Sequence, residues 1–136
     1  METLFEIRFP ACPDRLCMIR SMVRNTARVC GCSSDLAEHL VIAVNEACMN
    51  VIQHAYQGDE QGEIILKMLN NEGSLYFKLY DYANPVNLED IKSRDLNDLR
   101  PGGLGINFIN DIMDECHRGH LDEGKGNYLE MIKKIT

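Results

Sequence analysis

The sequence contains no apolar run that is long enough to cross a membrane. A membrane-spanning helix needs roughly 20 consecutive apolar residues, whereas the longest run near the centre of this chain is Leu40–Val44. The N-terminus, METLFEIRFP, also lacks the basic, apolar and small-residue order of a secretory signal peptide. We therefore expect a cytoplasmic protein that has no membrane partner.

Basic residues are in deficit. The 136 residues include 14 Lys and Arg against 21 Asp and Glu, which gives a net charge of -7 and a pI near 5.0. Because binding to nucleic-acid phosphates requires a basic surface, we expect no direct nucleic-acid partner. Positive charge is concentrated in a row of arginines spaced four residues apart: Arg20, Arg24 and Arg28. This row is either a solvated helix face or a surface that docks an acidic partner protein.

The six cysteines do not have the spacing of a zinc site. They are scattered, and Cys116 with His117 and His120 lacks a second cluster that would complete a tetrahedron. Without a secretion signal, free thiols are expected rather than disulfides.

Internal repeats and low-complexity segments are absent, and the length suits a single domain over residues 1–136. Alternating apolar residues predict a strand over residues 2–9, a hairpin around Asn71-Glu72-Gly73, and two more strands over 116–121 and 128–135.

Helical spacing of apolar residues predicts helices over residues 14–30 and 35–54. A third helix is expected after the glycine loop, with Leu104, Phe108, Ile112 and Met113 as its core candidates. The order of the elements indicates an α+β fold: a two-layer α/β sandwich in which helices cover one face of a mixed, mostly antiparallel sheet.

Three polar residues recur every four positions in the second predicted helix: Glu46, Asn50 and His54. They form a slowly turning row at the margin of the apolar stripe. Because burying unpaired polar groups costs free energy, three together indicate a lined cavity. A carboxylate and an amide oxygen are also ligands that Mg²⁺ prefers.

A glycine loop, RPGGLG, stands directly before the third predicted helix at Arg100–Gly105. Its backbone N–H groups can approach an anion closely, and the helix N-terminus adds a favourable dipole. The loop has neither the Rossmann spacing nor the Gly-Lys-Ser/Thr of a Walker loop. Asp81, at the end of a hydrophobic strand, is a third candidate site residue.

The order of these features resembles the GHKL ATPase family, which has the Bergerat fold. Within that family, VNEACMNVIQHAY is similar to the N-box of the anti-sigma-factor serine kinases, GGLGINFINDIMDE to their second glycine box, and GKGNYLEMIKK to their closing strand. The resemblance covers about residues 5–135. It implies an ATP-dependent serine kinase that phosphorylates a STAS-domain antagonist and sequesters a sigma factor or related regulator, and it is compatible with a homodimer.

The resemblance also implies a role for each candidate residue. Asn50 would hold the Mg²⁺ that bridges the phosphates, and Glu46 would be the general base that polarises the attacking serine hydroxyl. Asp81 would accept a hydrogen bond from the adenine amino group, with Asn127 in support. Residues 84–101 would form the lid, His54 would contact phosphate or lid or pack beneath Tyr56, and the phosphate-binding positions would be Arg100, Gly102, Gly103, Leu104 and Gly105.

One motif departs from the family. The family usually has Asp-x-Gly after the adenine-binding strand, whereas this chain has Asp81-Tyr82-Ala83. If that glycine has a positive φ, alanine costs about 1 kcal/mol or more there. The departure favours an alternative, a non-catalytic partner-binding module of the same fold, whereas the presence of both Glu46 and Asn50 favours the enzyme.

Overall fold

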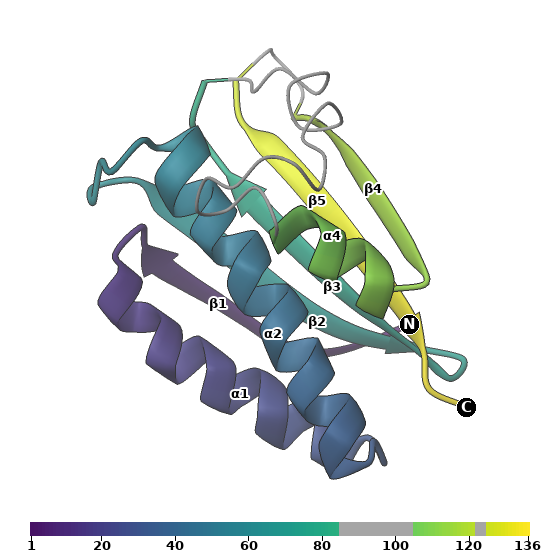
Figure 1. Ribbon diagram of the computed structural model, residues 1–136. Helices are drawn as coiled ribbons and strands as arrows, with labels where there is room; N and C mark the ends of the chain where they lie inside the picture. The colour runs from purple at the N-terminus through teal and green to yellow at the C-terminus, as the bar shows by residue number, and fades with distance from the viewer. Residues whose placement is uncertain (85–104, 122–124) are drawn as a thin grey trace.

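The computed structural model describes residues 1–84, 105–121 and 125–136. The described residues form one five-stranded sheet with helices packed against one of its faces (Figure 1). The expected α+β class and the placement of the helices on one face are therefore confirmed.

The sheet has the strand order β1-β2-β3-β5-β4. Its strands are β1 (Glu2–Pro10), β2 (Glu63–Asn71), β3 (Ser74–Asp81), β4 (Glu115–His120) and β5 (Asn127–Lys134). Each neighbouring pair is antiparallel, so within the described part of the chain the sheet contains no parallel pair. The last strand, β5, lies between β3 and β4, which brings the start of β5 beside the end of β3 (Figure 1).

The β2–β3 hairpin closes through a two-residue turn, as its Asn-Glu-Gly sequence predicts. Glu72 and Gly73 have φ angles of 50° and 86°, and Asn71 pairs with Ser74 across the turn. Two consecutive positive φ angles match the right-handed twist of the flanking strands.

The helical layer consists of α1 (Leu16–Val29), α2 (Ser34–Asn50) and α4 (Gly105–Ile112), with α2 between the other two (Figure 1). Among the described residues, no helix combines the length and apolarity that crossing a bilayer requires. Gly31, at φ 96°, ends the first helix, and the Ser33 hydroxyl accepts a hydrogen bond from the Leu36 N–H at 3.1 Å to cap the second.

Two predicted helix boundaries are corrected by the structure. The first helix begins with a 3₁₀ turn, η1 (Pro13–Arg15), in which the Leu16 N–H donates to the Pro13 carbonyl. The second α-helix ends at Asn50 rather than His54, and the chain continues as a π-helical turn, η2 (Val51–Ala55).

The core lies between α2 and the inner face of the sheet. On β3 the buried residues alternate, so Leu75, Phe77 and Leu79 point toward the helices. Asp81 continues this alternation and is 4% exposed, so its carboxylate also faces the helical layer.

The predicted core face of the third helix is partly wrong. Phe108 is 53% exposed, whereas its neighbour Ile109 is completely buried and Met113 is 5% exposed. Ile109 and Met113 are four residues apart and share one helix face, so the stripe is rotated by one residue from the predicted phase. Leu104 lies outside the described residues.

All six cysteines are thiols. Complete burial in α2 raises the pKa of Cys48 to about 12, so this thiol is protonated and packs as an apolar residue.

Candidate functional site

Asp81 and Asn127 form a buried polar pair where β3 ends and β5 begins. They are direct partners in the strand register and are 4% and 6% exposed. Asn127 Nδ2 donates to Asp81 Oδ1 at 2.8 Å, and the Ala83 N–H donates to the same oxygen at 3.0 Å. Since both bonds end on Oδ1, Oδ2 is the oxygen with acceptor capacity for a ligand.

The environment of Asp81 shifts its protonation equilibrium. Burial raises the pKa of the Asp81 carboxyl, and the hydrogen bonds from Asn127 and from the Ala83 N–H oppose this rise. A carboxylate with a raised pKa in a cavity is typical of a binding or catalytic site.

The turn after Asp81 is attached to the start of β5 through Gly126. The Gly126 N–H donates to the Ala83 carbonyl at 3.0 Å. Gly126 has a φ of 103°, and a Cβ at this position would lie 2.7 Å from the Asp81 carbonyl oxygen. Only glycine fits here without moving the backbone beside Asp81.

Ala83 adopts an ordinary backbone conformation. Among the described residues other than glycine, positive φ angles occur at Gln57 and Glu72. Alanine at position 83 therefore carries no left-handed strain, and the side chain is 6% exposed.

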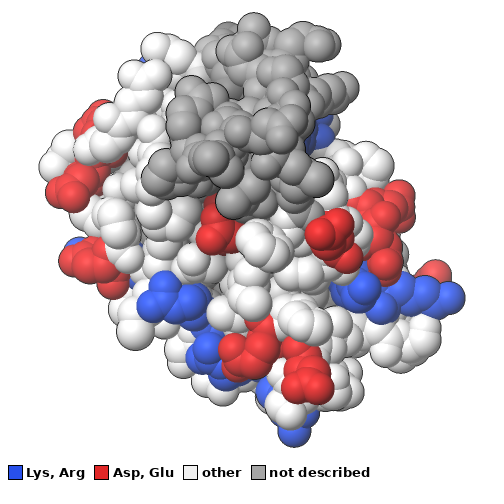
Figure 2. Space-filling view, viewed as in Figure 1, with Lys and Arg blue, Asp and Glu red and all other residues white. Residues whose placement is uncertain are grey.

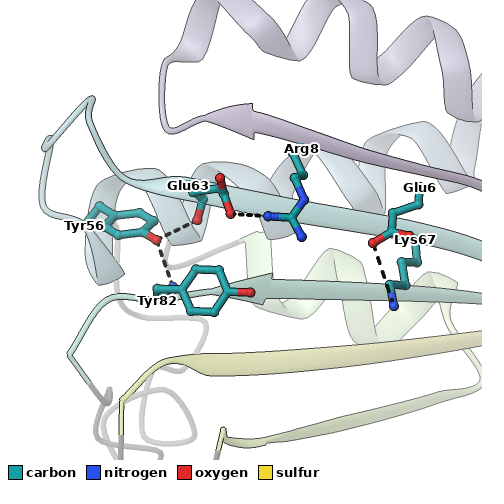
Figure 3. Close-up of polar contacts among 6 residues, drawn as sticks. All are labelled: Glu6, Arg8, Tyr56, Glu63, Lys67 and Tyr82. Carbon is teal, nitrogen blue, oxygen red and sulfur yellow. Dashed lines mark hydrogen bonds and ion pairs between the residues drawn. The ribbon is translucent and has the colours of Figure 1, made fainter.

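Tyr56, at the end of the η2 turn, bonds to the backbone at the same corner of the sheet (Figure 3). Its hydroxyl donates to the Glu63 carbonyl at 2.6 Å and accepts from the Tyr82 N–H at 2.8 Å. One phenol thus joins the start of β2 to the residue after Asp81.

A cavity of about 60 Å³ lies between the end of the α2–η2 helix and the inner face of the sheet. Its polar lining residues include Asn50 on α2, Asp81 on β3, Arg118 on β4 and Asn127 on β5. The structure therefore brings together three predicted site residues, Asn50, Asp81 and Asn127, from three separate elements.

Asn50 has the fewest hydrogen bonds from its side chain among these residues. Both its Oδ1 and its Nδ2 are buried, and neither has a hydrogen-bond partner. A buried amide without partners is costly, so its position at a cavity wall indicates a ligand that would bond to it.

The π-helical turn changes which residues reach the cavity. The Tyr56 N–H bonds to the Val51 carbonyl at 2.9 Å, five residues back, which widens the turn. Val51 and Ala55 line the cavity as a result. His54, on the same turn, and Glu46, half-buried one turn before Asn50, are not among the lining residues.

The remaining predicted site residues lie at or beyond the edge of the described residue ranges. Gly105 is the first residue of α4. The predicted lid from residue 85 onward, and the positions Arg100, Gly102, Gly103 and Leu104, lie outside the described residues. In the ranges that the structure describes, no group of three or more His, Cys, Asp or Glu side chains is arranged to hold a metal ion.

Arg118 is a cavity residue that the sequence pattern did not single out. Its β4 position pairs with Leu129 of β5, whose side chain faces the core. Alternation along residues 116–120 predicts that Cys116, Arg118 and His120 share a face, but only the register with β5 shows that this is the inner face.

The arginine row of α1 is bonded to neighbouring parts of its own chain. Arg20 donates to Asn45 Oδ1 at 3.0 Å, Arg24 forms an ion pair with Glu38, and Arg28 donates to the Cys32 carbonyl at 2.9 Å. On the face seen in Figure 2, basic and acidic side chains are interspersed. The contacts of Arg20 and Arg24 join α1 to α2, and that of Arg28 joins α1 to the loop between them, which favours the structural interpretation of the row.

Comparison with known proteins places this geometry in a family. The family model described as the histidine kinase-like ATPase domain matches residues 9–133. The serine-protein kinase RsbW of Bacillus licheniformis is 34% identical over 128 residues, which cover 88% of this chain and 79% of that protein. RsbW of Listeria monocytogenes is 32% identical over 132 residues, which cover 91% of this chain and 83% of that protein.

A solved structure shares the fold at lower sequence identity. A chain of the SiaB–SiaC complex from Pseudomonas aeruginosa aligns with a TM-score of 0.74 and 16% identity, over 96% of this chain and 89% of that chain. Family model, relatives and fold agree, and the chain belongs to the histidine kinase-like ATPase family, together with the RsbW serine-protein kinases.

Proposed function

We propose that this protein is an ATP-dependent serine protein kinase that also acts as an anti-sigma factor. The observation that carries the proposal is Asn50: its buried, unpartnered amide lies at the wall of a cavity that also contains Asp81. The relatives named serine-protein kinase RsbW support the reaction type.

In this proposal Asp81 recognises the adenine. Its Oδ2 accepts a hydrogen bond from the adenine amino group, while Asn127 and the Ala83 N–H hold Oδ1. The phosphates extend toward the N-terminus of α4, where Gly105 begins the helix and a helix dipole favours anions. Arg100, Gly102, Gly103 and Leu104 complete the phosphate-binding positions by their place in the sequence.

Asn50 is the residue that would hold Mg²⁺. Its orphaned Oδ1 is a hard oxygen ligand of the type that Mg²⁺ takes, with phosphate oxygens and water as further ligands. Bound Mg²⁺ supplies neutralisation of the phosphate charge. Glu46 precedes Asn50 by about one turn of α2 and acts as the general base toward the serine hydroxyl of the substrate.

The proposed substrate is a small STAS-domain antagonist, and the second partner is a sigma factor or related regulator. Phosphorylation would release the antagonist and leave the kinase free to bind the regulator in the cytoplasm, as a monomer or homodimer. If the arginine row contributes to docking, reversal of Arg20 and Arg28 to glutamate weakens partner binding and leaves ATP binding unchanged. Equal loss of both would count against a docking role.

The alternative is a non-catalytic partner-binding module. Its support from the sequence was backbone strain at Ala83, and the ordinary φ of Ala83 removes that support. We therefore favour the enzyme.

Transfer of labelled γ-phosphate to candidate STAS proteins tests the kinase. Wild type should phosphorylate one of them, and Glu46→Gln and Asn50→Ala should lose transfer, with Glu46→Gln still binding ATP. Tight partner binding without transfer by wild type would favour the alternative. Absence of ATP binding at millimolar concentration with Mg²⁺ would exclude the kinase directly.

A further inference from the structure

Arg118 is a cation in a largely apolar setting on the inner face of β4. Its Nη2 is buried and has no hydrogen-bond partner. Within the part of the chain that the structure describes, Arg118 forms no salt bridge with a carboxylate. Burial lowers the pKa of its guanidinium, and the neighbouring Cys116 thiol opposes that effect.

Asp81, the carboxylate that lines the same cavity, does not form an ion pair with Arg118. Its bonds are to Asn127 and the Ala83 N–H, and Arg118 does not influence its pKa. Arginine keeps its proton in proteins. Among the described residues, the cavity thus contains a permanent positive charge that no carboxylate pairs with.

Asn50 is a second residue in the cavity whose polar atoms lack partners. Asn50, which lines the same cavity, has a buried Oδ1 and Nδ2 without partners. A ligand that satisfies both residues must bring a negative group for Arg118 and a cation or donor for the Asn50 oxygen. A metal-bound phosphate meets both requirements.

We propose that Arg118 is a phosphate-binding residue of the nucleotide pocket, with its buried Nη2 donating a hydrogen bond to a phosphate oxygen of bound ATP. This inference rests on the proposed function, since it assumes that ATP binds at this cavity with a phosphate within reach of Arg118. It adds to the site a cation from β4, in a cavity whose other polar residues include Asn50 from α2.

A purely structural role for Arg118 predicts different behaviour. The aliphatic stem of an arginine can cover apolar surface, and its loss would then destabilise the ligand-free protein. A phosphate-binding role predicts that removal of the unpaired charge leaves the ligand-free protein equally stable or more stable, while affinity for phosphate-bearing ligands falls.

Calorimetric titration with adenosine, AMP, ADP and ATP, each with Mg²⁺, separates these roles. Arg118→Met keeps an unbranched side chain without the charge, and Arg118→Lys keeps a charge without the planar fork. Arg8→Met is the matched control, because Arg8 is an exposed arginine on β1 that pairs with Glu63 (Figure 3). Melting temperatures of the ligand-free proteins are measured in parallel.

We expect Arg118→Met to bind ATP about 10-fold to 100-fold more weakly, with adenosine affinity unchanged. Arg118→Lys should recover part of the loss and Arg8→Met should match wild type. Unchanged ATP affinity in Arg118→Met, or equal loss for adenosine and ATP, overturns the inference and leaves the proposed function intact. If wild type binds adenosine and ATP equally weakly or not at all, the inference about Arg118 and the proposed function are both contradicted.

Discussion

Asp81 accepts the amide of Asn127 and the N–H of Ala83 on one carboxylate oxygen, Oδ1. The orientation of the carboxylate is therefore set by two donors on one side, and Oδ2 remains for a ligand. In the proposed function, recognition of the adenine amino group would therefore depend on a single oxygen atom, Oδ2 of Asp81.

Replacement of Asp81 by asparagine should invert the hydrogen bonding toward the base. The two donors at Oδ1 will hold the amide oxygen of the new side chain, so its NH₂ group faces the ligand and opposes the adenine amino group. We expect about 100-fold weaker ATP binding and relatively tighter binding of inosine triphosphate, which carries a carbonyl at that position. Titration of both nucleotides measures this, with the exposed Asp111→Asn as control; equal affinities in Asp81→Asn and wild type would contradict the assignment.

The raised pKa of Asp81 predicts a specific pH dependence of stability without nucleotide. Because the folded protein holds this proton more tightly than an unfolded Asp with a pKa of 3.8, its stabilising contribution is complete below pH 3.8. That contribution is lost as the pH rises through the folded pKa of Asp81. Urea unfolding of wild type and Asp81→Asn across this range should show wild type losing stability relative to the variant as pH rises; the opposite slope would mean that the folded pKa is depressed.

Tyr56→Phe should loosen the corner that holds Asp81. The variant keeps the aromatic ring and leaves the Tyr82 N–H and the Glu63 carbonyl without the phenol. We expect a loss of about 1 kcal/mol in the free energy of unfolding and a measurable loss of ATP affinity. Tyr80→Phe makes the same chemical change on β3, beside Lys67, and should bind ATP like wild type. Identical ATP affinity in both variants would limit Tyr56 to a role in stability.

Two glycines with similar φ angles allow strain and contact to be separated. Gly31 and Gly126 have φ angles of 96° and 103°, but a Cβ meets nothing within 4 Å at Gly31 and lies 2.7 Å from the Asp81 carbonyl oxygen at Gly126. Gly31→Ala should lower the free energy of unfolding by about 1 kcal/mol through strain alone. Gly126→Ala should cost more and should also weaken ATP binding, since the backbone beside Asp81 must move. Equal unfolding free energies for the two variants would show that the contact is relieved without cost.

The fold was predictable because its signals are local. The two-residue turn at Glu72-Gly73 and the alternation along β3 each depend on a few neighbouring residues, and each was found where the sequence predicts it. The pair of Asp81 and Asn127 came from the family resemblance, because strand periodicity alone does not show which strands are neighbours.

The structure differs from the predictions made from sequence at positions where tertiary packing determines which residue is buried or lines the cavity. Phe108 and Ile109 fit a helical stripe about equally well by composition, and only the position of α4 against α2 selects Ile109 for the core. The π-helical turn inserts one residue into the expected period and brings Val51 and Ala55 to the cavity. Arg118 became a cavity residue through the register of β4 with β5, which no spacing in the sequence encodes.

The position of β5 within the sheet has a consequence for synthesis on the ribosome. Asp81 and its partner Asn127 are 46 residues apart, and chains are made from the N-terminus onward. A nascent chain that stops before Gly126 presents β3 as an unpaired edge, which favours association with other strands or with chaperones. If nucleotide binds beside Asp81 as proposed, it can therefore assist folding only after β5, which carries Asn127, has emerged and paired with β3.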